Sequence, residues 1–338
     1  MAKMSDFTLA HQDEFPHQPD GNSNFNESVF VNGYDHTHKL GGWMRIGNRA
    51  NEGHAEMQVC LYLPGNRIAC NFQRPKITDN KQFAAGGLKY DVVEPFKKVN
   101  MSYEGELLIL NDPNALRVGG DVFNNAPRVK GSLNWDNVAI SPIHGGIPLR
   151  EDVIPLYGRN FSLNHFNQHT KVTGSLVVGD ESWEFKNGWG WRDHSWGPRY
   201  WQNIFFHRLF MINFPDGRGA MLLKITDPNG NARRVGCLLA DGEYEDILDM
   251  DLVTHEWTSE KDPISYTVTA RTAKRTAVIK GRIVTGAPLR NRRKVDDTTL
   301  IQRIFEASTE FEWDGVKGFG QSEYIERIEN DKLVGYPL

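Results

Sequence analysis

The sequence predicts an all-β protein built from two antiparallel β domains. Short segments of alternating apolar and polar residues recur along the 338-residue chain, and turn residues separate them at near-regular spacing. A strand–helix–strand rhythm, the mark of a parallel sheet, is missing from the sequence pattern. The length exceeds that of a usual single domain. Closed barrels are favoured over open sheets, because closure removes unpaired strand edges and encloses an apolar cavity.

The first half begins with residues 1–24, which are rich in His, Gln, Asp and Pro. We expect them to form a flexible N-terminal tail, or a strap lying over the first domain. Alternation and turn residues then predict strands and a hairpin, with two brief helices. These elements are the hairpin Met57–Leu63 and Arg67–Cys70 around Pro64-Gly65-Asn66, the strand Glu104–Leu110, and helices at Thr78–Ala85 and Arg117–Asn124.

The second half is equally rich in predicted strands, and Gly, Pro, Asp and Asn mark the turns between them. In order, the predicted strands are Lys171–Val178, Ser182–Lys186, Phe210–Phe214, Ala220–Thr226, Arg234–Ala240, Tyr266–Thr272, Ala277–Val284, Glu306–Trp313 and Gly320–Ile328. Pro155, Gly158 and Asn160 interrupt the pattern near Leu156–Asn164. We therefore expect an N-terminal domain over residues 25–160 and a C-terminal domain over 161–338.

Composition excludes several classes of function. The chain has 39 basic and 43 acidic residues and a net charge of −4, and its one dense basic patch, 290–294, is expected to be a solvated loop rather than a nucleic-acid site. No stretch approaches the ~20 apolar residues that span a bilayer, and residues 1–24 lack a signal-peptide core. Cys60, Cys70 and Cys237 lack metal-ligand spacing and are expected to be reduced packing residues of a cytoplasmic protein.

The candidate functional site is the stretch from Gly188 to Trp201. Five of the nine tryptophans fall between Trp183 and Trp201, interleaved with an acid, an imidazole and two guanidinium groups. Such density is typical of a cavity wall on which a few polar groups converge. The alternative is a core-forming strand pair in which Asp193 and Arg192 form a buried ion pair.

Asp193 is the candidate general acid, and His194 is its candidate hydrogen-bond partner or proton relay. Neighbours on a strand point to opposite faces, so a bulge or turn at Gly190 or Gly197 would be needed to bring both to one cavity. An Asp among indoles would have its charged form disfavoured, as a proton donor requires. Pairing with an arginine would instead keep Asp193 ionised and structural.

Other motifs indicate less. Ser195 follows Asp193 and His194 directly, which cannot form a serine-hydrolase triad. His36 and His38 would share one face of a strand, as some metal sites require, but a polar turn explains them more simply. Glu323 could point into a barrel or pair with an arginine such as Arg192 or Arg199. Glycine spacing gives no nucleotide site, and we expect no metal and no cofactor.

The segment Arg192-Asp193-His194-Ser195-Trp196-Gly197 resembles the Asp-His-x-Trp-Gly signature of the carotenoid 1,2-hydratase (hydroxyneurosporene synthase)/AttH-like family. Supporting stretches are Gly42–Gly47, Asn51–Gly53, Glu94-Pro95, Tyr103–Gly105 and Gly318–Tyr324. The resemblance covers most of the chain from about Phe25. It implies two tandem lipocalin-like barrels with an apolar ligand cavity, the second barrel carrying the motif.

The resemblance also implies chemistry. Family members include hydratases that add water to an isoprenoid double bond by acid catalysis, and fungal enzymes that promote pericyclic ring closures. Asp193, His194 and Trp196 are the matching positions. The hydratases also use a downstream Tyr-x-Asp pair; the later match here, Tyr244-Glu-Asp246, follows an acidic turn and is expected to face solvent. That departure disfavours hydration and leaves proton-initiated isomerisation or cyclisation open.

The leading hypothesis is a cofactor-independent lyase or isomerase of secondary metabolism, similar to a terpene cyclase, acting on a small hydrophobic, isoprenoid-like substrate. Asp193 and His194 would be catalytic. The expected substrate-binding residues are Trp189, Trp191, Trp196, Trp201, Arg192, Arg199, Tyr200 and Glu323. The alternatives are a non-catalytic carrier of a lipid, steroid or polyketide, and a pericyclase that acts by folding its substrate. A metal-dependent oxygenase using His36 and His38 is a third alternative. The sequence predicts no nucleic-acid partner, no stable membrane insertion and no particular oligomeric state.

Overall fold

The computed structural model describes residues 6–154, 163–201, 204–226, 232–295, 297–330 and 332–334. Contacts between residues divide the chain into two units. Unit 1 comprises residues 1–110 and 126–200, and unit 2 comprises residues 111–125 and 201–338. This division differs from the expected boundary near Leu156–Asn164. The reason is that β11 (Asn164–Val178) and β12 (Glu181–Pro198) pair with each other and with β9 (Arg128–Ala139) and β2 (Phe25–Asp35) of unit 1. Part of the expected boundary, residues 155–162, lies outside the described residues.

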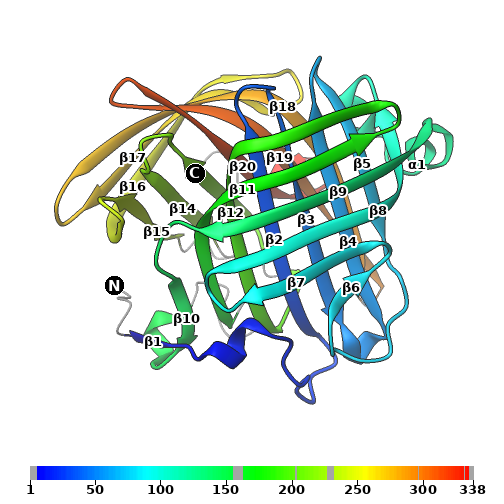
Figure 1. Cartoon of the computed structure of the whole chain (residues 1–338), viewed down its shortest axis with the longest axis horizontal. Helices are drawn as coiled ribbons and strands as arrows, with labels where there is room; N and C mark the ends of the chain where they lie inside the picture. The colour runs from blue at the N-terminus through cyan, green and yellow to red at the C-terminus, as the bar shows by residue number, and fades with distance from the viewer. Residues whose placement is uncertain are drawn as a thin grey trace. The chain divides into compact units, whose positions relative to one another are not determined.

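Unit 1 is an antiparallel sheet closed into a barrel (Figure 1). Eight strands pair in the ring order β11-β12-β2-β3-β4-β5-β8-β9 and back to β11. The elements of this unit are β1 (Phe7–Thr8), η2 (His11–Glu14), β2 (Phe25–Asp35), β3 (Leu40–Arg49), η3 (Ala50–Glu52), β4 (His54–Leu63), β5 (Arg67–Gln73), β6 (Phe83–Ala85), β7 (Leu88–Glu94), β8 (Lys98–Leu110), β9 (Arg128–Ala139), β10 (His144–Pro148), η5 (Glu151–Val153), β11 (Asn164–Val178) and β12 (Glu181–Pro198).

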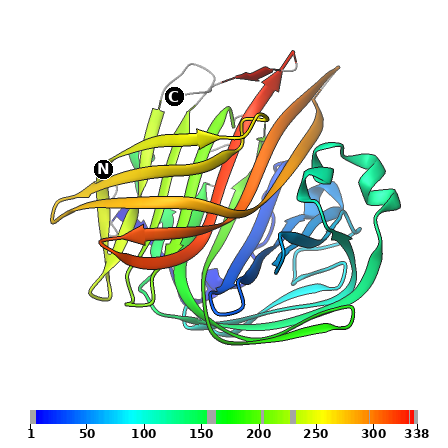
Figure 2. The ribbon, with the colours of Figure 1, turned by 90° about the horizontal axis from the view of Figure 1, so that it is seen from above.

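Unit 2 is a second closed antiparallel barrel. Strands β13 to β20 pair in chain order, and β13 also pairs with β20, which closes the ring. Figure 2 shows its long, bent strands in orange and red. The elements are η4 (Pro113–Arg117), α1 (Gly120–Asn125), β13 (Phe206–Asn213), β14 (Gly219–Thr226), β15 (Ala232–Ala240), β16 (Glu243–Trp257), β17 (Pro263–Thr272), β18 (Thr276–Val295), β19 (Thr298–Trp313), β20 (Val316–Glu329) and β21 (Lys332–Val334).

The predicted all-β antiparallel fold and its strands are confirmed. In β8, Val99, Met101 and Tyr103 are buried in the core of unit 1 while the residues between them are less buried, as period-2 alternation requires. The hairpin of β4 and β5 turns at residues 64–66, where Gly65 and Asn66 take the positive φ values that a tight turn needs. The predicted turn at 227–230 lies outside the described residues.

Two local predictions were wrong and a third was confirmed in part. Residues 78–82 are not helical, because the Asn80 side chain hydrogen-bonds Glu27 and the His17 backbone, and Phe83 enters the core in strand β6. The brief helix expected at 117–124 is present as α1 over residues 120–125, preceded by the separate helix η4. The basic patch 290–294 lies in β18 rather than in a loop, since it pairs with β19.

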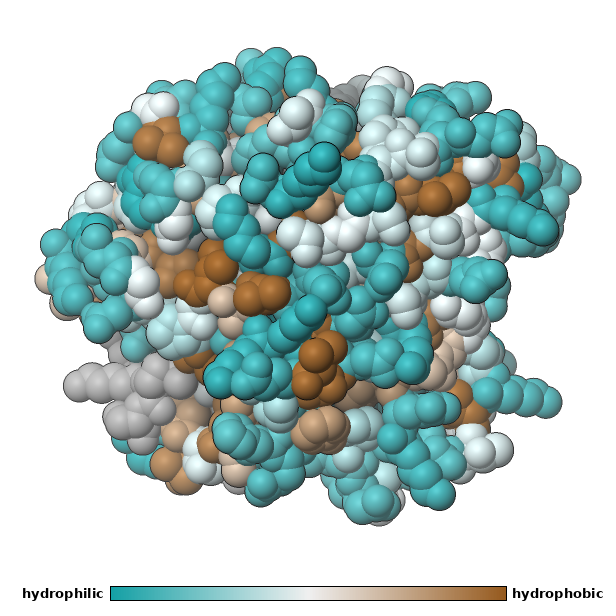
Figure 3. All heavy atoms as spheres, viewed as in Figure 1, coloured by the Kyte–Doolittle hydropathy of each residue, from teal (hydrophilic) through white to brown (hydrophobic). Residues whose placement is uncertain are grey.

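The three cysteines lie in the interior, as the sequence predicts. Cys60, Cys70 and Cys237 are all buried, as predicted for packing residues, and burial raises the pKa of the Cys70 thiol to about 12. Figure 3 shows one face of the molecule, on which hydrophobic side chains form small patches among hydrophilic ones. None of the helices in the described ranges has the length and apolar character needed to cross a bilayer.

Candidate functional site

Strands β2 and β3 of unit 1 and the second half of β12, residues 188–198, are largely buried on both faces. All ten residues of β3 are buried, as are ten of the eleven in β2. Most strands of a barrel alternate between buried and exposed residues. Polar side chains on these three strands are instead shielded from water on both faces, so they need hydrogen-bond partners within the protein. Of the stretch that the sequence singled out, Gly188 to Trp201, residues 188–198 form the end of β12.

The bulge that would bring Asp193 and His194 to one cavity is absent, since β12 pairs in unbroken register with β2 from Trp189 to Pro198. Its pairing with β11 is also regular from Trp189 to Trp196. Successive residues therefore point to opposite faces. Arg192, His194 and Trp196 share the face of core residues such as Val29 and Val31, inside the barrel. Trp191, Asp193 and Ser195 lie on the outer face.

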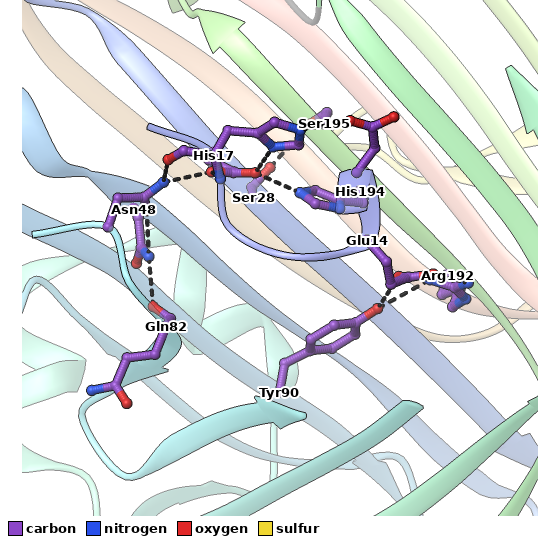
Figure 4. Close-up of polar contacts among 12 residues, drawn as sticks. Glu14, His17, Ser28, Asn48, Gln82, Tyr90, Arg192, His194 and Ser195 are labelled. Atoms are coloured by element: carbon purple, nitrogen blue, oxygen red, sulfur yellow. Dashed lines mark hydrogen bonds and ion pairs between the residues drawn. The ribbon is translucent and has the colours of Figure 1, made fainter. Parts of the chain in front are cut away.

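The N-terminal strap, defined here as residues 11–17, inserts polar side chains into the barrel. Glu14 is fully buried and its carboxylate accepts hydrogen bonds from both terminal nitrogens of Arg192, at 2.6 and 3.0 Å. Tyr90 hydrogen-bonds both Glu14 and Arg192 (Figure 4), and Gln168 accepts from Arg192. Burial alone would lower the pKa of Arg192, but Tyr90 and Glu14 outweigh it and raise that pKa. Residue 14 of the strap is thus packed inside the barrel through its carboxylate.

A second cluster lies beside the first inside the barrel. The Oε1 atom of Glu27 is 2.6 Å from Nδ1 of His17 and 2.8 Å from Nε2 of His194. Asn80 donates to the other carboxylate oxygen, Oε2. The ring of His17 stacks on Trp196 at 4.1 Å between centroids. Figure 4 shows His17 and His194 converging on this point. A buried carboxylate between two imidazoles thus fastens the strap to β12.

The ionised forms of Glu27 and His17 in this cluster stabilise each other. Burial raises the pKa of Glu27, but hydrogen bonds and attraction from His17 and His194 lower it further than burial raises it. Burial likewise lowers the pKa of His17, and Glu27 and Asp13 more than reverse that effect, so the pKa is raised. The ion pair of His17 and Glu27 therefore stabilises the docked strap.

We expect the strap's stabilising effect to depend on pH in two directions. The contribution of Glu27 is full above about pH 4.5 and is lost as pH falls through its lowered pKa. The contribution of His17 is full below about pH 6.5 and is lost as pH rises through its raised pKa. The drop in melting temperature caused by His17→Phe, which keeps a ring against Trp196, should be largest between these values. A drop that stays constant from pH 5 to 9 would contradict the ion pair.

His17, Glu27 and His194 are also a possible metal-ligand set, since their ligand atoms all lie within 4.8 Å of one another. Two imidazoles and a carboxylate suit several divalent transition metals. The short N–O distances are those of hydrogen bonds. The metal site considered at His36 and His38 does not match this location: His38 pairs with Asp35 at 2.8 Å and is half exposed.

On the outer face, Asp193 pairs with His165 rather than with His194. Oδ2 of Asp193 lies 3.3 Å from Nε2 of His165, and the two side chains are 21% and 28% exposed, so both can be reached from outside. Nε2 of His194 bonds Glu27 on the opposite side of the sheet. The predicted partnership of Asp193 and His194 is therefore wrong, because unbroken strand geometry separates the two side chains.

Aromatic rings lie next to this pair. Phe30 is directly opposite Asp193 in the register of β2 and β12. Its ring centroid is 6.0 Å from that of Trp191 and 6.0 Å from that of Trp43. The amide of Asn167, also directly opposite Asp193 on β11, is buried with neither polar atom bonded. This face, with Phe30, Trp43, Trp191, Asp193 and His165, is called the aromatic face below.

The other predicted binding residues are dispersed. Trp196 and Arg192 lie inside the barrel. Trp189 is half-buried under the ammonium group of Lys171, 3.0 Å from its ring centroid. Tyr200 ends unit 1 and Trp201 begins unit 2, both half-buried.

Glu323 of β20 belongs to a carboxyl cluster of unit 2. It lies 2.5 Å from Nε2 of His207 and also hydrogen-bonds Glu306, instead of the arginine partner that the sequence suggested. Burial and the charge of Glu323 raise the pKa of Glu306 well above its ordinary value. Tyr244 and Asp246, expected to face solvent, are half-buried in β16.

Sequence reasoning missed Glu14, His17, Glu27, His165 and Phe30. Polar residues inside the otherwise apolar strand 25–35 were the available signal for Glu27. Nothing local marks the others, since their partners lie 10 to 178 positions away in the chain.

A family model described as a domain of unknown function, DUF7064, matches residues 10–328. The chain belongs to this family. Comparison with curated proteins finds no match in sequence.

Solved structures with similar folds span nearly the whole chain. A protein of Nitrosomonas europaea assigned as AttH has a TM-score of 0.67 and 14% identity, over 96% of this chain and 98% of that one. Kievitone hydratase from Nectria haematococca has a TM-score of 0.56 and 12% identity, over 94% and 93%. CghA with Sch210972 has a TM-score of 0.57 and 8% identity, over 90% and 89%. At such identities the likeness is one of fold, and it confirms the AttH-like, lipocalin-like architecture without singling out carotenoid hydratases.

Proposed function

We propose that this DUF7064 protein is an enzyme that hydrates, isomerises or cyclises an unsaturated, isoprenoid-like substrate by proton transfer at Asp193 and His165. The observation that carries the proposal is the reachable Asp193–His165 pair set among Phe30, Trp191 and Trp43. Support also comes from the fold neighbours, which include a hydratase and a protein with a bound small molecule.

The proposed reaction begins when the Asp193–His165 pair donates a proton to one carbon of a double bond. The alkene's electron pair forms the new C–H bond and leaves a carbocation on the other carbon. Aromatic faces stabilise cations, so Phe30, the half-buried ring opposite Asp193, is suited to contact this intermediate, while the buried Trp191 and Trp43 pack against Phe30. Water can add to this carbocation and then release a proton to the pair, or the carbocation can lose a proton from a neighbouring carbon to the pair. A second double bond can instead attack it, which closes a ring and forms a new carbocation that ends in one of these two ways. Each route returns a proton to the pair, and none requires a cofactor.

His194 has a different role in this proposal. Because it bonds Glu27 inside the barrel, it holds the strap and sets the position of β12, and is thus a positioning residue. The Asp-His-x-Trp-Gly motif would then combine two tasks on alternate residues: Asp193 faces the substrate, and His194 and Trp196 hold the N-terminal strap.

The test is product mass in deuterated water. The protein is incubated with a panel of linear and prenylated isoprenoids, beside Asp193→Asn. We expect a product with one solvent deuteron on carbon for the wild type and none for the variant. Conversion to a product without deuterium would contradict the proposal and indicate a pericyclase. Ligand binding without conversion over the whole panel would favour the carrier.

A further inference from the structure

Next to the aromatic face, the same side of the sheet becomes strongly basic. The register of β12, β2 and β3 places Asp193, Phe30 and Arg45 in one row, and Ser195, Ser28 and Gly47 in the next. A Cβ on Gly47 would lie 2.6 to 2.8 Å from the Arg45 guanidinium group. The absence of a side chain at Gly47 thus lets Arg45 lie along the sheet, toward Glu56.

Three arginines gather here and all are buried. Arg45 and Arg49 share the carboxylate of Glu56 at 3.0 and 2.9 Å. Arg199 donates to the hydroxyl of Ser195 at 2.8 Å. Burial, then repulsion from Arg45 and Arg49, lowers the pKa of Arg199 to about 9, while Asp193 and Glu56 only partly offset this. The three guanidinium groups therefore repel one another, and the nearby carboxylates balance this repulsion only in part at Arg199.

Two buried donors in this cluster have no acceptor. Arg49 uses Nε for Glu56 and Nη1 for Glu52, and its buried Nη2 has no hydrogen-bond partner. Asn26 accepts from Arg45 through Oδ1, and its buried Nδ2 is also unbonded. Arg49 and Asn26 are 0% and 1% exposed. An unmet buried donor costs about 1–3 kcal/mol, so such groups are expected where a ligand supplies the acceptor.

We propose that Arg45, Arg49, Arg199 and Asn26 form a binding site for an oxyanion, a carboxylate or phosphate group at one end of an apolar ligand. Both unmet groups are donors and three buried guanidinium groups lie beside them, so the site favours a ligand with acceptor oxygens and disfavours a cation. The adjacent aromatic face would receive the apolar part. The site extends the proposed function, because it implies a substrate with an acidic end group. In this respect the inference rests on the proposed function.

The experiment measures binding, so it is independent of turnover. Laurate, dodecyl phosphate and dodecanol are titrated into the full chain at low ionic strength, with tryptophan fluorescence as readout. We expect at least one of the two anions to bind ten or more times more tightly than the alcohol. The better anion identifies the end group. Equal affinity for all three ligands would overturn the proposal, whether or not the protein has isomerase activity.

Asn26→Asp is the decisive variant. It keeps the acceptor for Arg45 and replaces the unmet donor with a negative charge beside three arginines, so its melting temperature should be unchanged or higher. We expect its anion affinity to fall at least tenfold and its dodecanol affinity to stay the same. Asn66→Asp, in the exposed β4–β5 turn, carries the same charge change and should bind like the wild type. Unaltered anion binding by Asn26→Asp would overturn the proposal.

Discussion

Replacing Glu14 with glutamine is expected to destabilise unit 1 by about 3–5 kcal/mol, because it leaves the buried Arg192 cation without its carboxylate. Arg192 is 1% exposed and cannot turn to water in the folded state. Tyr90 and Gln168 would still contact it, but neither carries a compensating charge at neutral pH. The measurement is denaturant unfolding followed by tryptophan fluorescence.

A double variant separates loss of the pair from loss of packing. Glu14→Met with Arg192→Met removes both charges and keeps side chains of similar length, so it should unfold at higher denaturant concentration than Glu14→Gln. If Glu14→Gln costs less than about 1 kcal/mol, the strap is not an integral part of the barrel. If the double variant is the less stable of the two, packing rather than charge dominates.

Asp193→Asn is expected to lower kcat by about 10²- to 10⁴-fold, the usual contribution of a positioned acid or base, and to leave KM nearly unchanged. The amide keeps the size of the side chain and can still bond His165, but it cannot deliver a proton. Because the side chain is only partly buried, the melting temperature should change little. The measurement is steady-state kinetics on whichever isoprenoid the wild type converts.

The chain offers a matched control in a second aspartate–histidine pair. Asp35 and His38 lie 2.8 Å apart, at the turn after β2. Asp35→Asn makes the same chemical change away from the aromatic face, so it should retain full turnover. A similar loss of kcat in both variants would indicate a general effect of removing an acidic group. Full activity of Asp193→Asn would remove Asp193 from the reaction.

Local sequence patterns were sufficient to predict much of the fold. The hairpin of β4 and β5 follows from alternation on either side of Pro64-Gly65-Asn66, and turn residues likewise bounded most strands of unit 2. Strand periodicity and turn chemistry depend on neighbouring residues, so they can be read without the tertiary structure. The same approach failed at residues 78–82. The segment is not helical there, and the Asn80 side chain hydrogen-bonds Glu27, which is far away in the chain.

The sequence also located the functional stretch, because five tryptophans beside Asp193 and His194 are conspicuous in any context. It predicted that the two would point to opposite faces of a regular strand. Only the tertiary structure decided that β12 is regular there, that His194 lies inside the barrel, and that Asp193 meets His165 outside. No short sequence pattern marks the strap residues Glu14 and His17 or the arginines of β3. Their partners are brought together by barrel closure, which depends on contacts between residues far apart in the chain and not on any short pattern within it.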